Sequence, residues 1–153
     1  MTSPSRSDIE AAAYNYLARR DHGRGELRQK LLRKDFPSSL VEEVLDTLEE
    51  AGYVNDGIFA RHQGSILARK CWGPLQISAK LRARGIASDL VDEVLDEISA
   101  EESFSSHARH RLQSRFGDAS TLDEKTRQKA YRHLVYRGYA PQMIRRLLFD
   151  FSD

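Results

Sequence analysis

The apolar residues of this chain recur at the spacing of an α-helix. In segments 40–46 and 90–96 they stand at positions i, i+1, i+4 and i+5, which places them along one side of a helix. Segment 143–151 carries a diverged version of the same stripe. The strict alternation that is typical of a half-buried strand is not found. The pattern therefore predicts an all-α fold.

The stripe belongs to an internal repeat. Residues 17–50 align without a gap on residues 67–100, and residues 137–151 align more weakly on residues 84–98. A period of about fifty residues is typical of stacked supersecondary units, each too small to bury its apolar side alone. We therefore expect three tandem three-helix repeats that form one continuous structural domain, an elongated and curved solenoid-like rod. The expected units are 8–52, 56–101 and 104–150.

Start and stop signals divide each unit into three helices. Three pairs have the spacing of a capping box, namely Ser7 with Glu10, Ser39 with Glu42, and Thr121 with Glu124. Pro74 suits the first turn of a helix, and four glycines suit left-handed helix ends: Gly52, Gly85, Gly117 and Gly138. Asp35 stands where the second repeat has Gly85, and aspartate tolerates that conformation better than most residues. The predicted helices are 8–20, 24–34, 39–51, 56–71, 74–84, 89–101, 104–116, 122–137 and 141–150.

Composition fits exposed helices with narrow apolar stripes, since 31% of residues are charged and only 8% are aromatic. There is no apolar run of membrane-spanning length, and the first residues lack the pattern of a secretory signal. We therefore expect a cytoplasmic, monomeric protein with no membrane contact. Cys71 is the only cysteine, so the fold has no intrachain disulfide.

The net charge of +1 conceals blocks of opposite sign along the chain. Basic blocks at 17–34, 61–84 and 109–146 are separated by acidic blocks at 38–50 and 88–102. Basic side chains aligned on one surface release counterions when they meet a phosphate backbone, although any single one can be an ordinary solvated residue. The predicted protein and nucleic-acid interface comprises Arg19, Arg20, Arg24, Arg28, Arg61, Arg69, Lys70, Lys80, Arg82, Arg84, Arg132 and Arg137.

Signals for catalysis are weak. The run Gly23-Arg24-Gly25 lacks the third glycine of a dinucleotide-binding turn, and no phosphate-binding Gly-Lys-Ser/Thr motif occurs. His107 and His110 could share a metal ion, but solvated histidines on a helix surface are the favoured interpretation. Cys71 is interpreted as a packing residue rather than a reactive thiol. We therefore expect no enzyme activity, no catalytic residue, no cofactor and no bound metal.

Two acidic clusters and three tyrosines allow more than one role. The carboxylates of 42–46 and 92–96 could chelate Mg²⁺, but a solvated helix side is favoured. Tyr139 is expected in the core, because it takes the place of Ile86 in the preceding repeat. For Tyr131 and Tyr136, base stacking and capping of the repeat end fit equally well.

The ordered set of motifs resembles the RecX family over nearly the whole chain. The motifs are Tyr16-Leu17-Ala18-Arg19-Arg20, Glu26-Leu27-x-x-Lys30-Leu31, Gly52-Tyr53-Val54-Asn55-Asp56 with Phe59-Ala60, Trp72-Gly73-Pro74, Leu81-x-x-Arg84-Gly85-Ile86 and Tyr136-Arg137-Gly138-Tyr139. Asn55 departs from the family, which commonly has an acid there.

The resemblance implies a regulator in DNA repair, recombination and the SOS response. Such a protein lodges along the groove of the RecA filament on DNA and restrains its recombinase, ATPase and coprotease activity. It would contact both RecA and DNA, without sequence specificity, and it carries over no catalytic residue. The alternative from another class is a tandem helix-turn-helix regulator that reads duplex DNA, and a small hydrolase is a third, more distant one.

Overall fold

The computed structural model describes residues 3–101 and 103–150, which form nine α-helices, one short 3-10 helix and no strand. The helices are α1 (Arg6–Arg19), α2 (Arg24–Leu32), α3 (Ser38–Glu50), α4 (Asp56–Arg69), α5 (Pro74–Ala83), α6 (Ser88–Glu101), α7 (Phe104–Phe116), α8 (Glu124–Arg137) and α9 (Pro141–Phe149), with the 3-10 helix η1 (Ala119–Thr121) between α7 and α8. The prediction of an all-α fold is confirmed.

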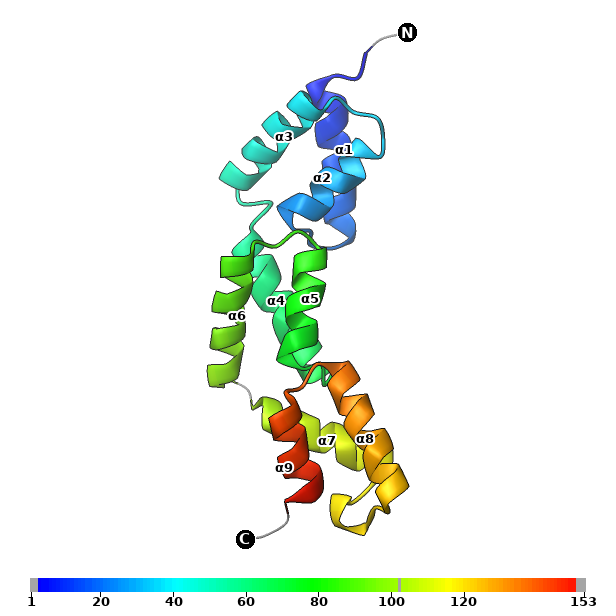
Figure 1. Cartoon of the computed structure of the whole chain (residues 1–153). Helices are drawn as coiled ribbons and strands as arrows, with labels where there is room; N and C mark the ends of the chain where they lie inside the picture. Colours follow the sequence, from blue (N-terminus) through cyan, green and yellow to red (C-terminus); the bar gives the residue numbers. More distant parts are fainter. Residues whose placement is uncertain (1–2, 102, 151–153) are drawn as a thin grey trace.

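The helices pack in consecutive groups of three along an elongated molecule (Figure 1). Helices α1–α3 contact one another, as do α4–α6 and α7–α9, and η1 packs on α7 and α9. We call these groups units 1, 2 and 3. Units 1 and 3 lie at opposite ends of the molecule, with unit 2 between them (Figure 1).

Helix starts differ from the predicted capping boxes. Helix α1 begins two residues earlier than expected, because Ser5 caps it and forms a reciprocal capping box with Asp8. Helix α3 follows Pro37 and has no side-chain cap. Thr121 ends η1, and Asp123 caps α8 instead. All three predicted capping boxes are therefore wrong, because the spacing of two residues cannot show at which residue the helix begins.

Helix ends were predicted more accurately. All four predicted glycines have positive φ, and Asp35 adopts φ 61° where unit 2 has Gly85 at φ 85°. Gly138 is in the left-handed region, whereas Gly117 combines φ 88° with ψ −162°, a backbone conformation suited to glycine. Cys71 also has a positive φ of 63°, which the sequence did not indicate.

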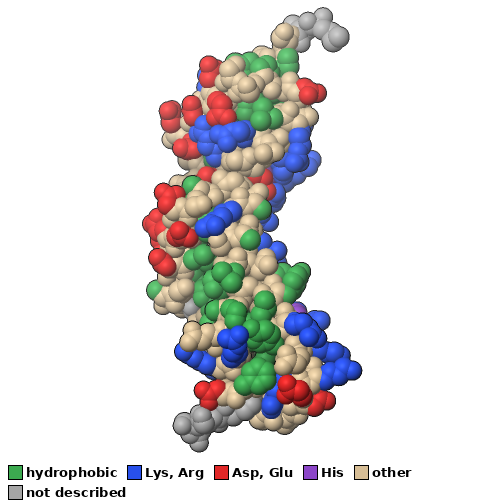
Figure 2. Space-filling view, in the orientation of Figure 1, with side chains coloured by type: hydrophobic (Ala, Val, Ile, Leu, Met, Phe, Trp, Pro, Cys, Tyr) green, Lys and Arg blue, Asp and Glu red, His purple; other side chains and the backbone are tan. Residues whose placement is uncertain are grey.

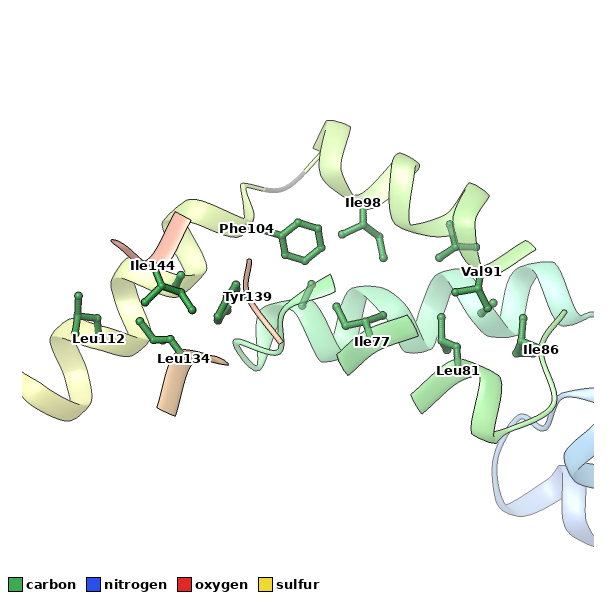
Figure 3. Packing of buried hydrophobic residues seen from close by; sticks show 14 of the residues in the cluster. Ile77, Leu81, Ile86, Val91, Ile98, Phe104, Leu112, Leu134, Tyr139 and Ile144 are labelled. Carbon is green, nitrogen blue, oxygen red and sulfur yellow. The ribbon is translucent and has the colours of Figure 1, made fainter. Parts of the chain in front are cut away.

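The buried apolar side chains form two separate clusters. One lies within unit 1 and its connection to α4: Ile9, Ala12, Ala13, Leu27, Leu31, Val41, Val44, Leu45, Leu48 and Val54. The other runs continuously through units 2 and 3, where residues from Ile86 and Leu81 to Ile144 and Leu112 line up along the helices (Figure 3). Tyr139 is fully buried inside this second cluster, as expected. Units 2 and 3 therefore share a core from which unit 1 is separate.

The hydrogen bonds between neighbouring units also connect units 2 and 3 more firmly than units 1 and 2. Between units 2 and 3, the Gly73 amide donates to the Arg137 carbonyl at 2.7 Å, and the Leu75 amide donates to the Gly138 carbonyl at 3.1 Å. Between units 1 and 2, the Arg24 amide donates to the Asp56 carboxylate at 2.7 Å. Backbone hydrogen bonds and a shared core therefore fix unit 3 on unit 2, whereas the Asp56 side chain helps to hold unit 1 on unit 2.

Candidate protein and nucleic-acid interface

The basic second helix of unit 1 faces the acidic third helix. Arg24 donates to Glu42 at 3.0 Å, to Asp46 at 2.7 Å and to Glu49 at 3.0 Å, and only 20% of its side chain is exposed. These carboxylates raise the pKa of the Arg24 guanidinium, although its burial opposes them. Arg24 therefore holds α2 on α3, and its charge is used inside the chain.

Arg28 and Arg20 are also neutralised within unit 1. Arg28 donates two hydrogen bonds to Glu42, and these bonds, together with Arg24, lower the pKa of the Glu42 carboxyl to about 2. Arg20 donates through both terminal nitrogens to Glu26, at 2.9 and 3.0 Å. Such two-pronged pairs are the stronger kind of surface ion pair.

Unit 2 repeats this arrangement. Arg61 donates to Glu97 at 2.7 Å and to Glu93 at 3.3 Å, and Arg82 lies 3.6 Å from Asp92. The block 61–84 has no acid in its own sequence, but the fold brings α6 beside it. Sequence distance alone therefore did not show that Arg61 and Arg82 have acidic partners.

Aromatic rings hold three further cations of the predicted interface. The Lys80 Nζ lies 4.2 Å and the Arg137 Cζ lies 3.7 Å from the centre of the Trp72 ring. Arg137 also donates to the Cys71 carbonyl at 3.0 Å. Arg84 lies 5.9 Å from the Phe59 ring centre. These aromatic contacts position the side chains without cancelling their charge, although the charge of Arg84 also helps to lower the pKa of the Glu26 carboxyl.

The other predicted positions are exposed on three different helices or their ends. They are Arg19, Arg69, Lys70 and Arg132. The structure therefore distributes the predicted set over all three units instead of gathering it on a single basic side.

One groove does bring basic side chains of two units together. It has a volume of about 560 Å³ and lies where α2 of unit 1 meets the end of α5. Three predicted residues line it, Arg28, Arg82 and Arg84, together with Lys30 and Arg33, which the prediction omitted. Glu26, Gly25 and Gly85 also line it, and a Cβ at Gly25 would lie 3.3 Å from the Gly85 Cα.

A second basic cluster lies in unit 3 and was missed at Arg111 and Arg115. Arg111 donates through Nε to the His133 Nε2 at 3.0 Å, so this side of α7 meets α8. The spacing of residues 107, 111 and 115 puts them on one side of a helix, which is the sequence signal that could have identified them. Basic side chains gather over α8 at one edge of unit 3, and acidic ones along the opposite edge of units 1 and 2 near α3 and α6 (Figure 2).

The remaining candidate chemistry is reported for the described residues. Within 3–101 and 103–150, no group of three or more His, Cys, Asp or Glu residues is close enough to hold a metal ion. Cys71 is buried, with 7% of its surface exposed. Of the tyrosines that the sequence left open, Tyr136 is 65% exposed beside Trp72, and Tyr131 is half-buried with Arg145 over its ring. None of the described helices is long and apolar enough to cross a membrane.

An all-α fold of consecutive three-helix units with charged, solvent-facing surfaces defines a helical-repeat protein. The chain belongs to the RecX family, because three family models match it in order: the first RecX three-helix domain at residues 11–48, the second at 55–95 and the third at 101–148.

Relatives and solved structures agree with this assignment. The chain is 34% identical over 140 residues to the regulatory protein RecX of Pseudomonas fluorescens strain Pf-5, covering 92% of this chain and 89% of the relative. It is 33% identical to the regulatory protein RecX of Ectopseudomonas mendocina, covering 92% of each chain. The fold is similar to the crystal structure of RecX from Lactobacillus salivarius, with a TM-score of 0.78, 20% identity and 93% of each chain covered. It is also similar to the crystal structure of a second regulatory protein RecX, with a TM-score of 0.75 and 22% identity, where the match covers 95% of this chain and 73% of the other.

Proposed function

We propose that this protein binds the RecA filament on DNA and lowers its recombinase, ATPase and coprotease activity. The observation that carries the proposal is the ordered match of all three RecX three-helix domains along one chain. In this proposal the protein acts by binding, as a cytoplasmic monomer without a cofactor, and has no catalytic residue. Its elongated row of units offers the extended surface that a filament groove requires (Figure 1).

The proposed interface consists of those predicted basic residues that form no ion pair with a carboxylate of the described chain. Arg20, Arg24, Arg28, Arg61 and Arg82 already pair with carboxylates of the chain, so their net contribution to a polyanion is reduced. Lys70 and Arg84 are exposed and belong to the acid-free block 61–84. They are the positions where charge reversal tests filament binding most directly.

The test measures RecA-dependent ATP hydrolysis on single-stranded DNA, together with co-sedimentation of the protein with RecA filaments. Wild-type protein should sediment with the filament and slow hydrolysis. Lys70→Glu combined with Arg84→Glu should weaken inhibition while circular dichroism stays unchanged, and the salt dependence should flatten by roughly 0.7 to 0.9 logarithmic units for each lost phosphate contact. Absence of sedimentation with the filament would refute the proposal, and a sequence-specific footprint on duplex DNA would favour the helix-turn-helix alternative.

A further inference from the structure

Unit 3 lacks the acidic helix that neutralises basic side chains in units 1 and 2. Helices α3 and α6 each carry several carboxylates, whereas α9 (Pro141–Phe149) has no acid and contains Arg145 and Arg146. The same place in the repeat has therefore changed the sign of its charge. Basic residues on neighbouring helices of unit 3 cannot be paired in the way that Arg24 and Arg61 are.

The acids between α7 and α8 are engaged mainly by local hydrogen bonds, and the charge of Lys129 also helps to lower the pKa of the Asp123 carboxyl. Asp118 accepts from Ser120, Asp123 caps α8 through the Thr126 amide, and Glu124 accepts from Gln128. In the described part of the chain, no carboxylate lies within ion-pair distance of Arg111, Arg115, Arg132 or Arg137, and no carboxylate contributes to the pKa shift of Arg137. The charge of these residues is therefore available to a partner.

Three of these arginines lie around one imidazole, that of His133. Arg111 donates to His133 at 3.0 Å, and the Phe116 ring packs edge-on against the same imidazole with ring centres 5.8 Å apart. Burial, followed by the charges of Arg115, Arg111 and Arg137, lowers the pKa of His133 to about 4. A neutral histidine is the expected result of burial together with the positive potential of three neighbouring arginines.

Aromatic side chains lie beside this cluster. Arg137 stacks over Trp72, and Tyr136 lies 6.1 Å from the same ring, centre to centre, with most of its own surface exposed. Residues 129, 132, 133 and 136 follow helical spacing on the part of α8 that its core residues Ala130 and Leu134 leave uncovered. Exposed aromatic rings among arginines are typical of surfaces that bind single-stranded nucleic acid, because bases stack while guanidinium groups hold phosphates.

We propose that this α7–α8 surface, made of Arg111, Arg115, Lys129, Arg132, His133, Tyr136 and Arg137, is where the chain binds the backbone of single-stranded nucleic acid. Arginines of units 1 and 2 mainly hold the acidic helices α3 and α6. The inference deepens the proposed function. It rests on that function only for the identity of the nucleic acid, which would be the DNA strand of the filament. It assigns a nucleic-acid contact to unit 3, in addition to the phosphate contacts proposed for Lys70 and Arg84 of unit 2.

The experiment measures fluorescence anisotropy of a labelled oligo(dT) without RecA, at several salt concentrations. Arg111→Gln combined with Arg115→Gln should weaken binding by roughly tenfold and reduce the salt slope by about 1.4, which is about 0.7 for each lost contact. The matched control is Arg61→Gln combined with Arg82→Gln, which removes two arginines that pair with α6 and should change affinity less than about twofold. Arg111→Lys combined with Arg115→Lys should keep most of the salt slope, because the charge remains.

Two further readouts separate this inference from the proposed function. Binding of oligo(dT) should raise the NMR-measured pKa of His133, because phosphates offset the surrounding positive charge. The inference is overturned if wild-type protein does not bind oligo(dT) at low salt, or if the control variant loses as much affinity as the unit 3 variant. It is also overturned if the unit 3 variant binds oligo(dT) normally but no longer inhibits RecA, since the surface would then contact protein. Loss of oligo(dT) binding in the unit 3 variant, with no effect of wild type on RecA, would support the inference and reject the proposed function.

Discussion

Individual basic residues in this protein do different work according to what lies opposite them. Arg24 reaches three carboxylates of α3 and is mostly covered, so it acts as a structural tie. Arg137 lies on an aromatic ring and donates to the Cys71 carbonyl, and burial together with the charge of Arg111 lowers its pKa. Arg111 faces an imidazole. Arginine therefore ties α2 to α3 at position 24, connects unit 3 to unit 2 at position 137, and contributes positive charge beside an imidazole at position 111.

His133 makes a prediction about pH. Its pKa is about 4 in the folded chain against an ordinary value of 6.5, so between these values the unfolded chain binds the proton more readily. Stability should therefore fall as the pH drops from about 6.5 to about 4, and His133 should add nothing to this dependence above that range. Since the side chain is only half-buried, the effect should be about 1 kcal/mol at most.

Thermal melts of wild type and His133→Gln at pH 7 and pH 4.5 measure this effect. The variant should lose less stability than wild type over that interval, because its side chain does not titrate. Equal losses in both proteins would show that the imidazole is not held neutral by its surroundings.

At the scale of helices and their connections, glycines set the joints. Gly138 ends α8 with φ 97°, and a Cβ there would lie 2.5 Å from the Gln76 amide nitrogen in the neighbouring unit. Gly52 ends α3 with a similar φ of 84°, but a Cβ there would meet nothing within 4 Å. The two positions share a positive φ, and they differ in whether another unit lies against them.

These two glycines therefore form a matched pair of substitutions. Gly52→Ala should cost about 1 to 2 kcal/mol, which is the strain of a side chain in the left-handed region. Gly138→Ala should cost at least about 1 to 3 kcal/mol more, because the methyl group also pushes α5 away from α8. Urea denaturation measures both values, and equal costs would contradict the tight joint between units 2 and 3.

For the whole molecule, the two apolar clusters predict two steps of unfolding. The cluster of unit 1 and the cluster of units 2 and 3 share no buried residue. Trp72, the only tryptophan, packs against the second cluster. Its fluorescence should therefore report on units 2 and 3 alone, whereas circular dichroism reports on all helices.

Substitutions in each cluster test this separation. Leu45→Ala removes a fully buried side chain from unit 1 and should destabilise that unit by roughly 2 to 5 kcal/mol. Its urea transition should shift by circular dichroism but not by Trp72 fluorescence. The matched control is Leu81→Ala, equally buried in the second cluster, which should shift the fluorescence transition. If Leu45→Ala shifts both signals together, the chain unfolds as one cooperative unit.

The sequence by itself determined the helices, most of their ends and the fold class. These features depend on contacts between residues a few positions apart, so the stripe in 40–46 and 90–96 and the glycines at helix ends carry them directly. The repeat also indicated three units, although their expected boundaries and their superposition remain predictions. Capping residues were mistaken because several polar residues near a helix start satisfy the same spacing.

Only the tertiary structure decided which charges remain free. Arg61 and Glu97 stand 36 positions apart, and their hydrogen bond exists because α4 packs on α6. In unit 3 the same packing brings Arg111 to His133, and among the residues that the structure describes it brings no carboxylate to either of them. The sign and position of each charge are written along the chain, but an ion pair acts over a few ångströms of space, and only the packing of helices sets that distance.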